Sequence, residues 1–238
     1  MTSLVSELAH EPWRRRLYLP NYAIGEAARY SGISSQTVAA WHKVGGRKGL
    51  ALSKKEKKEA LSYMQLIEVA VVAAFRRAGV SLKRVHDARE YVRKQLECEY
   101  PFAEYRFKTN GKRLWMDYQQ IEGEKGRGKL LGVDQGGQLA WEAIIGRRLQ
   151  EFDYEDGGVA IRWRVAGQKS PIIIDPRISY GAPTVGGIPT WVLKGRWEAG
   201  ESIADIAEDF GLHRLDVRKA LQFEGLKPDL KRQRKWVH

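Results

Sequence analysis

Apolar residues in the first hundred positions recur mostly with helical spacing. Early in the chain they predict two short helices packed together, because Ala27 and Ala28 allow a close approach and Val38 and Trp41 fall on one face. Gly32 stands between these helices, where the left-handed turn conformation favours a residue without a β-carbon. The segment therefore predicts a helix-turn-helix.

The second helix of this pair predicts a DNA contact. Ser34 or Ser35 would cap it. With the apolar face buried, the side chains expected to face outward are Ser35, Gln36, Ala39, His42 and Lys43. Short polar side chains at the start of such a helix reach base edges in a major groove, and Gln suits adenine. An ordinary helical hairpin is the alternative interpretation.

Basic clusters flank the predicted helix-turn-helix in the sequence. Arg14–Arg16 follow Trp13, and the segment 43–58 holds seven Lys and Arg residues against one Glu. Such density suits contacts with the phosphate backbone, although a solvated surface is the other explanation. The predicted DNA contacts are Arg14, Arg15, Arg16, Ser35, Gln36, Thr37, His42, Lys43, Arg47 and Lys48.

Two longer helices are expected next. The Gly-rich, basic segment 44–53 is typical of a short β-wing or of a plain loop. From Lys54 to Ala78 the spacing is helical, with Ser53 as the expected cap. A second helix is expected over 82–97, capped by Ser81, and this pair could carry a dimer contact.

Past Pro101 the pattern changes to alternation, which we take as a domain boundary. Asn110–Gly111 and Asp156–Gly157 each stand between alternating segments and predict β-hairpins, with a helix expected over 138–149. The run GEKGRGKL at 123–130 resembles a phosphate loop but lacks the hydroxyl residue that would bind magnesium, so nucleotide hydrolysis is not expected.

From residue 170 the chain predicts a short strand, a Pro- and Gly-rich turn and three amphipathic helices. The spacing Ala207, Gly211, Leu212 repeats that of the first turn, so a second helix-turn-helix-like unit is expected. Its outward positions include the acidic residues Asp205, Glu208, Asp209 and Asp216. Because acidic residues repel phosphates, we expect this unit to contact protein rather than DNA.

Charge and composition narrow the function. The net charge is +12, of which +6 lies in residues 1–60 and +4 in residues 227–238. Two basic ends suggest polyanionic or acidic partners. No apolar run approaches the roughly 18 residues that span a bilayer, so a cytoplasmic protein without a membrane partner is expected.

The sequence gives no sign of catalysis. The single cysteine, Cys98, excludes an internal disulfide, and the five histidines are scattered without metal-ligand spacing. Neither a catalytic constellation nor a metal or cofactor site is therefore predicted, and the chain is not expected to be an enzyme.

The order of these N-terminal elements resembles the DNA-binding domain of MerR-type regulators. The resemblance covers about Tyr22 to Leu96 and includes LSYMQLIEVAVVAAFRRAGVSLKRV. The usual aromatic-Arg start of the wing is replaced by His42-Lys43-Val44-Gly45-Gly46, and no long helix with sensor cysteines follows. The resemblance implies double-stranded operator DNA as a partner, whereas these two departures from the MerR pattern argue against metal or redox sensing.

The C-terminal stretch, about Ile172 to Glu224, resembles a small domain found at the C-terminus of VapB-like antitoxins. The residues that carry the resemblance are Asp175, Pro176, Gly181, Pro183, Gly187, Pro189, Gly200, Ile206, Val217, Ala220 and Leu221. The resemblance implies a PIN-like ribonuclease toxin as partner. Since such nucleases cluster carboxylates, Arg232, Arg234, Lys235 and Trp236 of the basic tail are candidate toxin contacts; nucleic acid or solvent are the alternatives.

Together these features predict an α+β protein: a MerR-like DNA-binding domain (1–100), a middle segment (101–169), a trihelical antitoxin-type domain (170–226) and a basic tail (227–238). The expected function is that of a homodimeric type II antitoxin, which represses its own operator and neutralises a PIN-like toxin. The alternatives are a ligand-responsive MerR-like repressor without a toxin partner and an enzyme.

Overall fold

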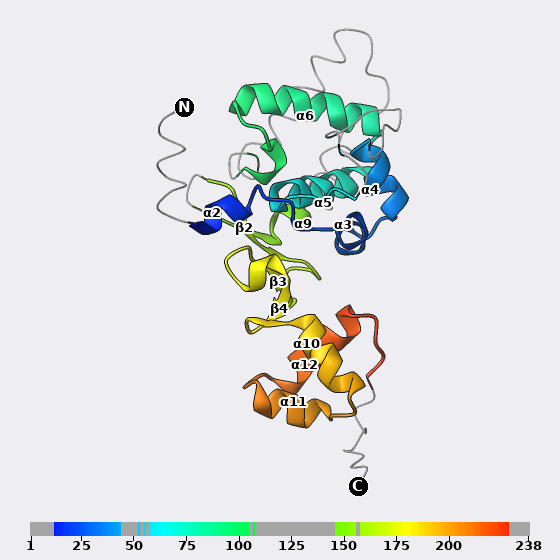
Figure 1. The fold of residues 1–238 in the computed structure, drawn as a ribbon. Coiled ribbons are helices and arrows are strands. Elements are labelled where there is room, and N and C mark those ends of the chain that lie inside the picture. Colours follow the sequence, from blue (N-terminus) through cyan, green and yellow to red (C-terminus); the bar gives the residue numbers. More distant parts are fainter. Residues whose placement is uncertain are drawn as a thin grey trace. The chain divides into compact units, whose positions relative to one another are not determined.

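The structure is a computed structural model that describes residues 12–43, 52, 55, 58–104, 107, 146–155 and 158–228. The chain forms two compact units, residues 1–161 (unit 1) and 162–238 (unit 2). Both contain helices, and five strands form a sheet in the order β1-β2-β3-β4-β5 (Figure 1). The predicted α+β class is therefore confirmed.

Unit 1 is organised around one long, buried helix, α5. Its elements are α2 (Pro12–Arg16), α3 (Ile24–Ser31), α4 (Ser35–Trp41), α5 (Tyr63–Arg77), α6 (Leu82–Leu96), the 3₁₀ helix η2 (Pro101–Ala103), α9 (Arg147–Leu149) and β1 (Phe152–Tyr154). Nearly every side chain of α5 is buried, as is typical of a helix that is apolar on all sides. Helices α3, α6, α9 and η2 all pack on it (Figure 1).

The start of α5 differs from the prediction. The expected helix from Lys54 begins only at Tyr63, with Ser62 as its cap: the Ser62 hydroxyl accepts from the Gln65 amide at 3.3 Å. Leu61 cannot be helical because its backbone exchanges hydrogen bonds with Tyr22 in a β-bridge, at 2.7 and 2.9 Å. The second predicted helix is confirmed as α6, capped by Ser81.

Unit 2 combines antiparallel strands with three helices. Its elements are β2 (Ala160–Arg164, which begins two residues before the unit), β3 (Ile173–Ile174), the 3₁₀ helix η4 (Ser179–Gly181), β4 (Pro183–Val185), β5 (Ile188–Pro189), α10 (Thr190–Glu198), α11 (Ile203–Asp209) and α12 (Arg214–Phe223). Trp163 pairs with Ile174, and Thr184 with both Ile173 and Pro189. The strand and the three helices expected here are confirmed.

The three helices of unit 2 enclose a small core. Leu193 of α10, Ile206 of α11, and Val217 and Leu221 of α12 are fully buried. Helix α12 contacts both of the other helices and strand β4. The three-helix arrangement thus fixes which face of α12 remains open to solvent.

Several predicted features lie outside the described residues. These are most of the wing segment 44–53, the hairpin turns at 110–111 and 156–157, the run 123–130, most of the helix 138–149, and the tail beyond residue 228. Strands β1 and β2 do flank the turn at 156–157. None of the helices in the described part of the chain has the length and apolar character needed to cross a bilayer.

Candidate nucleic-acid interface

Helices α3 and α4 meet in the turn that the sequence predicts. Gly32 adopts a left-handed conformation with φ of 67°, and the Ile33 amide donates to the Ala28 carbonyl at 3.0 Å. Ser34 then caps α4, because its hydroxyl accepts from the Thr37 amide at 3.1 Å. The turn thereby sets the direction in which α4 leaves α3.

The two faces of α4 differ as a groove-binding helix requires. Val38 and Trp41 are buried, whereas Ser35 and Gln36 are exposed at the start of the helix. Thr37 is half-buried, and its hydroxyl shares a hydrogen bond of 2.8 Å with the Ser34 hydroxyl. Ser35 and Gln36 are therefore the α4 side chains open to a partner at the N-terminal end of the helix.

His42 does not face outward, and this expectation is wrong. The helix ends at Trp41, and His42 is only 1% exposed. The His42 carbonyl accepts from the Lys55 amide at 3.0 Å, so the backbone at Lys55 lies against His42. Burial, reinforced by the positive charges of Lys55 and Arg89, lowers the pKa of His42 to about 4. A buried, neutral imidazole cannot reach DNA, so His42 is a core residue of unit 1.

The predicted basic contacts differ in their surroundings. Arg14 makes a bidentate ion pair with Glu155, at 2.6 and 2.7 Å, while Arg15 is exposed and Arg16 half-buried. Helices α2 and α4 lie towards opposite ends of α5 in Figure 1, so the arginine cluster is not beside α4. Lys43, directly after α4, is half-buried, and Arg47 and Lys48 lie outside the described residues.

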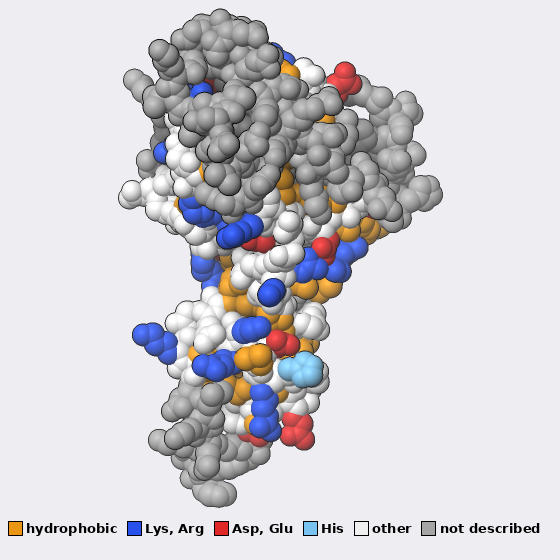
Figure 2. Space-filling model, turned by 180° about the vertical axis from the view of Figure 1, so that it is seen from behind, with side chains coloured by type: hydrophobic (Ala, Val, Ile, Leu, Met, Phe, Trp, Pro, Cys, Tyr) orange, Lys and Arg blue, Asp and Glu red, His pale blue; other side chains and the backbone are white. Residues whose placement is uncertain are grey.

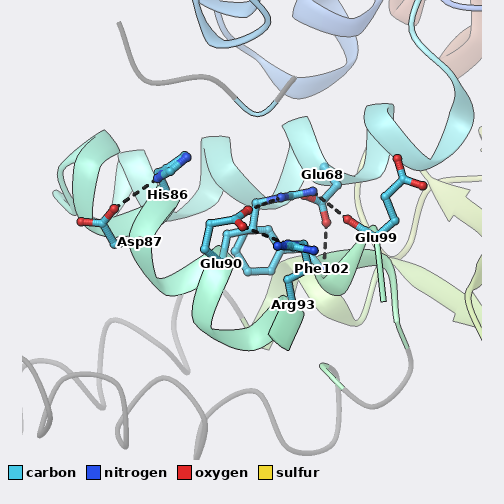
Figure 3. A network of polar contacts seen from close by, with 8 residues as sticks. Glu68, His86, Asp87, Glu90, Arg93, Glu99 and Phe102 are labelled. Atoms are coloured by element: carbon cyan, nitrogen blue, oxygen red, sulfur yellow. Dashed lines mark hydrogen bonds and ion pairs between the residues drawn. The ribbon is translucent and has the colours of Figure 1, made fainter. Parts of the chain in front are cut away.

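A buried polar network holds α5, α6 and η2 together behind His42. The Arg89 guanidinium bonds to the Glu68 carboxylate and to the Glu99 carbonyl, and Glu68 also accepts from the Phe102 amide at 2.8 Å (Figure 3). Together with His42, these polar residues line a cavity of about 300 Å³. Sequence spacing did not predict this network, because its partners come from separate elements.

Unit 2 repeats the turn of unit 1 at α11 and α12. Gly211 has a φ of 62°, and the Leu212 amide donates to the Ala207 carbonyl at 2.8 Å, close to the values at Gly32 and Ile33. Ser202 caps α11 by accepting from the Asp205 amide at 3.2 Å. The second helix-turn-helix-like unit is therefore present.

The segment around Asp175, which carries part of the resemblance to the antitoxin domain, is held by a buried ionic cluster. The Asp175 carboxylate is fully buried and accepts from the Arg177 amide at 2.9 Å, the Arg177 guanidinium at 2.6 and 2.9 Å, and Arg162 at 3.3 Å. Burial acts to raise the pKa of Asp175, but the bonds from Arg177 and Arg162 outweigh it and hold the pKa below its usual range. This cluster ties strand β2 to the segment after β3.

No metal-binding group appears in the part of the chain that the structure describes, where no three His, Cys, Asp or Glu side chains lie together suitably. The geometry that remains is that of two helix-turn-helix units. Each offers a short second helix with an open face, which is an arrangement for contacting a macromolecule.

Comparison with known proteins agrees with this architecture. Residues 172–223 match a family model described as "Protein of unknown function (DUF433)", which lies within the stretch that resembles the antitoxin domain. The chain is also 27% identical over 227 residues to "Putative antitoxin VapB45" of Mycobacterium tuberculosis (strain ATCC 25618 / H37Rv), covering 87% of this chain and 94% of that protein.

A solved structure has the same fold. The crystal structure of Rv2018 from Mycobacterium tuberculosis superposes with a TM-score of 0.67 at 22% identity, covering 87% of this chain and 99% of the other. At this identity the match shows the fold alone. Most of this chain therefore follows a known architecture.

Proposed function

We propose that the chain is the antitoxin of a type II toxin–antitoxin pair. The observation that carries this proposal is the extent of its likeness to the mycobacterial antitoxin, which covers 87% of this chain and 94% of that protein and so includes parts of both units. A shared C-terminal module alone would not explain a match of that length.

Within this proposal, unit 1 binds operator DNA through α4. The supporting observations are the glycine turn, the capped start of α4, and the exposure of Ser35 and Gln36 at that end. Two copies are expected to act together, because one short helix reads only a few base pairs and paired half-sites multiply the affinity. The partner toxin is proposed to be a PIN-like ribonuclease, which the basic tail would bind.

Co-expression tests the antitoxin role directly. The product of the neighbouring reading frame is expected to stop growth when expressed alone, and the full chain should restore growth and co-purify with it. An empty vector and an unrelated helix-turn-helix protein serve as controls. Failure of the chain to restore growth would contradict the proposal, and the lone repressor would then be favoured.

The substitution Gln36→Ala tests the groove assignment. Binding to a duplex from the region upstream of the gene should weaken about 10- to 100-fold, because a base contact is lost, while the salt dependence stays the same. Gln150→Ala, at another exposed glutamine of unit 1, is the matched control. Equal loss on operator and unrelated DNA would show that Gln36 does not read sequence.

Removal of residues 229–238 tests the tail. The truncated chain should bind operator DNA as before but inhibit the toxin less, because Arg232, Arg234, Lys235 and Trp236 are gone. A variant with Trp236→Ala alone separates the apolar contact from the charges. The opposite result, with DNA binding weakened and inhibition intact, would assign the tail to DNA.

A further inference from the structure

The positive charges of α12 are not neutralised within the described residues, unlike others in unit 2. Arg162 and Arg177 both bond to Asp175, and Arg196 bonds to Glu201 and Asp209. By contrast, the structure shows no ion pair between a described residue and any of the α12 cations, which are Arg214, Arg218 and Lys219. Arg214 is exposed and Arg218 and Lys219 are half-buried, so these three cations are candidates for contact with an external partner.

These cations lie on one open side of α12. Val217, Ala220 and Leu221 are buried, so with about 100° per residue the opposite face centres on Leu215, Lys219 and Gln222. Arg214 and Arg218 form one edge of that face, and the single carboxylate of the helix, Asp216, falls on the other edge. Leu215 is 57% exposed, which is high for a leucine.

The acidic residues that the sequence assigns to this unit belong mostly to the other helix. Asp205 and Asp209 are on α11, where Asp205 accepts from the Ser202 hydroxyl at 2.9 Å and Asp209 pairs with Arg196. Helix α11 is the first helix of the helix-turn-helix, which crosses above a groove rather than entering it. Its acidic charge therefore does not argue against DNA binding by α12.

A hollow beside α12 extends the basic surface. A cavity of about 580 Å³ lies between the β2–β3 turn, residues 166–170, and the C-terminal half of α12, and Lys169 and Lys219 both line it. Gln222 and the Ser170 region add hydrogen-bonding groups there. Two lysines at one hollow beside an α-helix suit a phosphate backbone that passes along the helix. Lys and Arg side chains are also spread over the lower part of the molecule in Figure 2.

We propose that α12 is a second DNA-contacting helix, which enters a major groove while Lys169 and Lys219 contact the adjacent backbone. Arg214 and Arg218 can bond to guanine, Gln222 to adenine, and Leu215 can contact a thymine methyl. Its turn has the same geometry as the α3–α4 turn, but its open face is charged whereas that of α4 is neutral. This goes beyond the proposed function, which places operator binding on unit 1 alone.

The triple variant Arg214→Gln/Arg218→Gln/Lys219→Gln of the full chain tests the charges. Its affinity for the upstream duplex should fall about 10- to 100-fold, and the slope of log affinity against log salt should decrease by about 1, because Lys219 is the one of these three cations assigned to a phosphate. The matched control Lys83→Gln/Arg84→Gln/Lys94→Gln removes three cations from α6. Equal losses in both variants would overturn the proposal, because net charge alone would then explain them. Circular dichroism confirms that each variant is folded.

A photocrosslinking experiment tests the contact between α12 and DNA without removing any charged side chain. With Leu215→p-benzoylphenylalanine in the full chain, irradiation in the presence of duplex and toxin should attach the chain to DNA. Because the Leu215 side chain is 57% exposed, the larger photocrosslinking group does not have to displace buried neighbours. Crosslinking to the toxin, or to neither partner, would overturn the proposal; the first result would make α12 a protein-binding surface.

The two DNA-binding assignments fail independently. If the α12 variants bind DNA normally and Gln36→Ala does not, the assignment of α12 to DNA is wrong and the operator assignment of unit 1 stands. If only the α12 variants lose affinity, unit 2 carries the DNA contact and the role of α4 is wrong.

Discussion

His42 makes the stability of unit 1 depend on pH. In the unfolded chain its imidazole takes up a proton near the ordinary pKa of 6.5, whereas in the folded chain burial and the nearby positive charges of Lys55 and Arg89 lower the pKa to about 4. Between these values the unfolded state binds more protons. The stability of unit 1 therefore falls as the pH is lowered from about 6.5 towards about 4.

The size of this effect follows from the two pKa values. Each pKa unit corresponds to about 1.4 kcal/mol, so the full difference is worth about 3 kcal/mol, of which about 2 kcal/mol is lost between roughly pH 7 and pH 5. The variant His42→Gln carries no titrating group at this position. Its free energy of unfolding should change by about 2 kcal/mol less than that of the parent chain over the same pH range.

Hydrogen exchange measured by mass spectrometry separates the two units. Exchange free energies of α5 amides, corrected for intrinsic rates at each pH, report unit 1, and those of α12 report unit 2. His86→Gln, at a half-buried histidine on α6, is the matched control and should retain the parent behaviour. If His42→Gln and the parent chain lose the same free energy in α5, the imidazole is not held neutral by burial and the reasoning is refuted.

Further substitutions test the buried ion pair and two glycine positions. Arg89→Ala should destabilise unit 1 by about 3–5 kcal/mol, because the Glu68 carboxylate stays buried without its cation. The double variant Glu68→Leu/Arg89→Leu should lose less stability, because no unpaired charge remains buried. Urea unfolding measures both variants, and equal losses of stability would show that the ion pair is not the cause. Gly195→Ala should stabilise unit 2 by about 1 kcal/mol, since Gly195 is inside α10 with open space at its β-carbon. Gly211→Ala should destabilise unit 2 by about 1 kcal/mol, because the φ of Gly211 is 62°, which residues with a β-carbon resist. Thermal unfolding measures both glycine variants, and a change of stability in the same direction for both would refute the turn geometry.

Whether the sequence predicts a feature depends on how far apart in the chain the interacting residues lie. The turns at Gly32 and Gly211 and the caps at Ser34, Ser81 and Ser202 are all predictable, because each depends on residues within about one helical turn. The exposure of Ser35 and Gln36 follows from the same local spacing, since the buried positions of α4 are near neighbours.

Contacts between distant segments explain the errors. Arg14 pairs with a carboxylate 141 residues away, and α5 starts late because Leu61 pairs with Tyr22. His42 was placed on a solvent face by helical periodicity, but α4 ends before it and the chain near Lys55 covers it. No local pattern contains this information.

The amino-acid sequence by itself thus determined most of the helices, the caps at Ser34, Ser81 and Ser202 and the two repeated turns, because backbone conformation and amphipathic spacing are local properties. Only the tertiary structure decided which polar side chains are free to meet a partner, since that depends on the carboxylates and backbone segments that folding brings to each one. Arg89 is buried against Glu68, whereas on α12 Arg214 is exposed and Arg218 and Lys219 are half-buried without an ion pair among the described residues. The burial of charge, more than its position in the sequence, separates the core of this protein from its candidate binding surfaces.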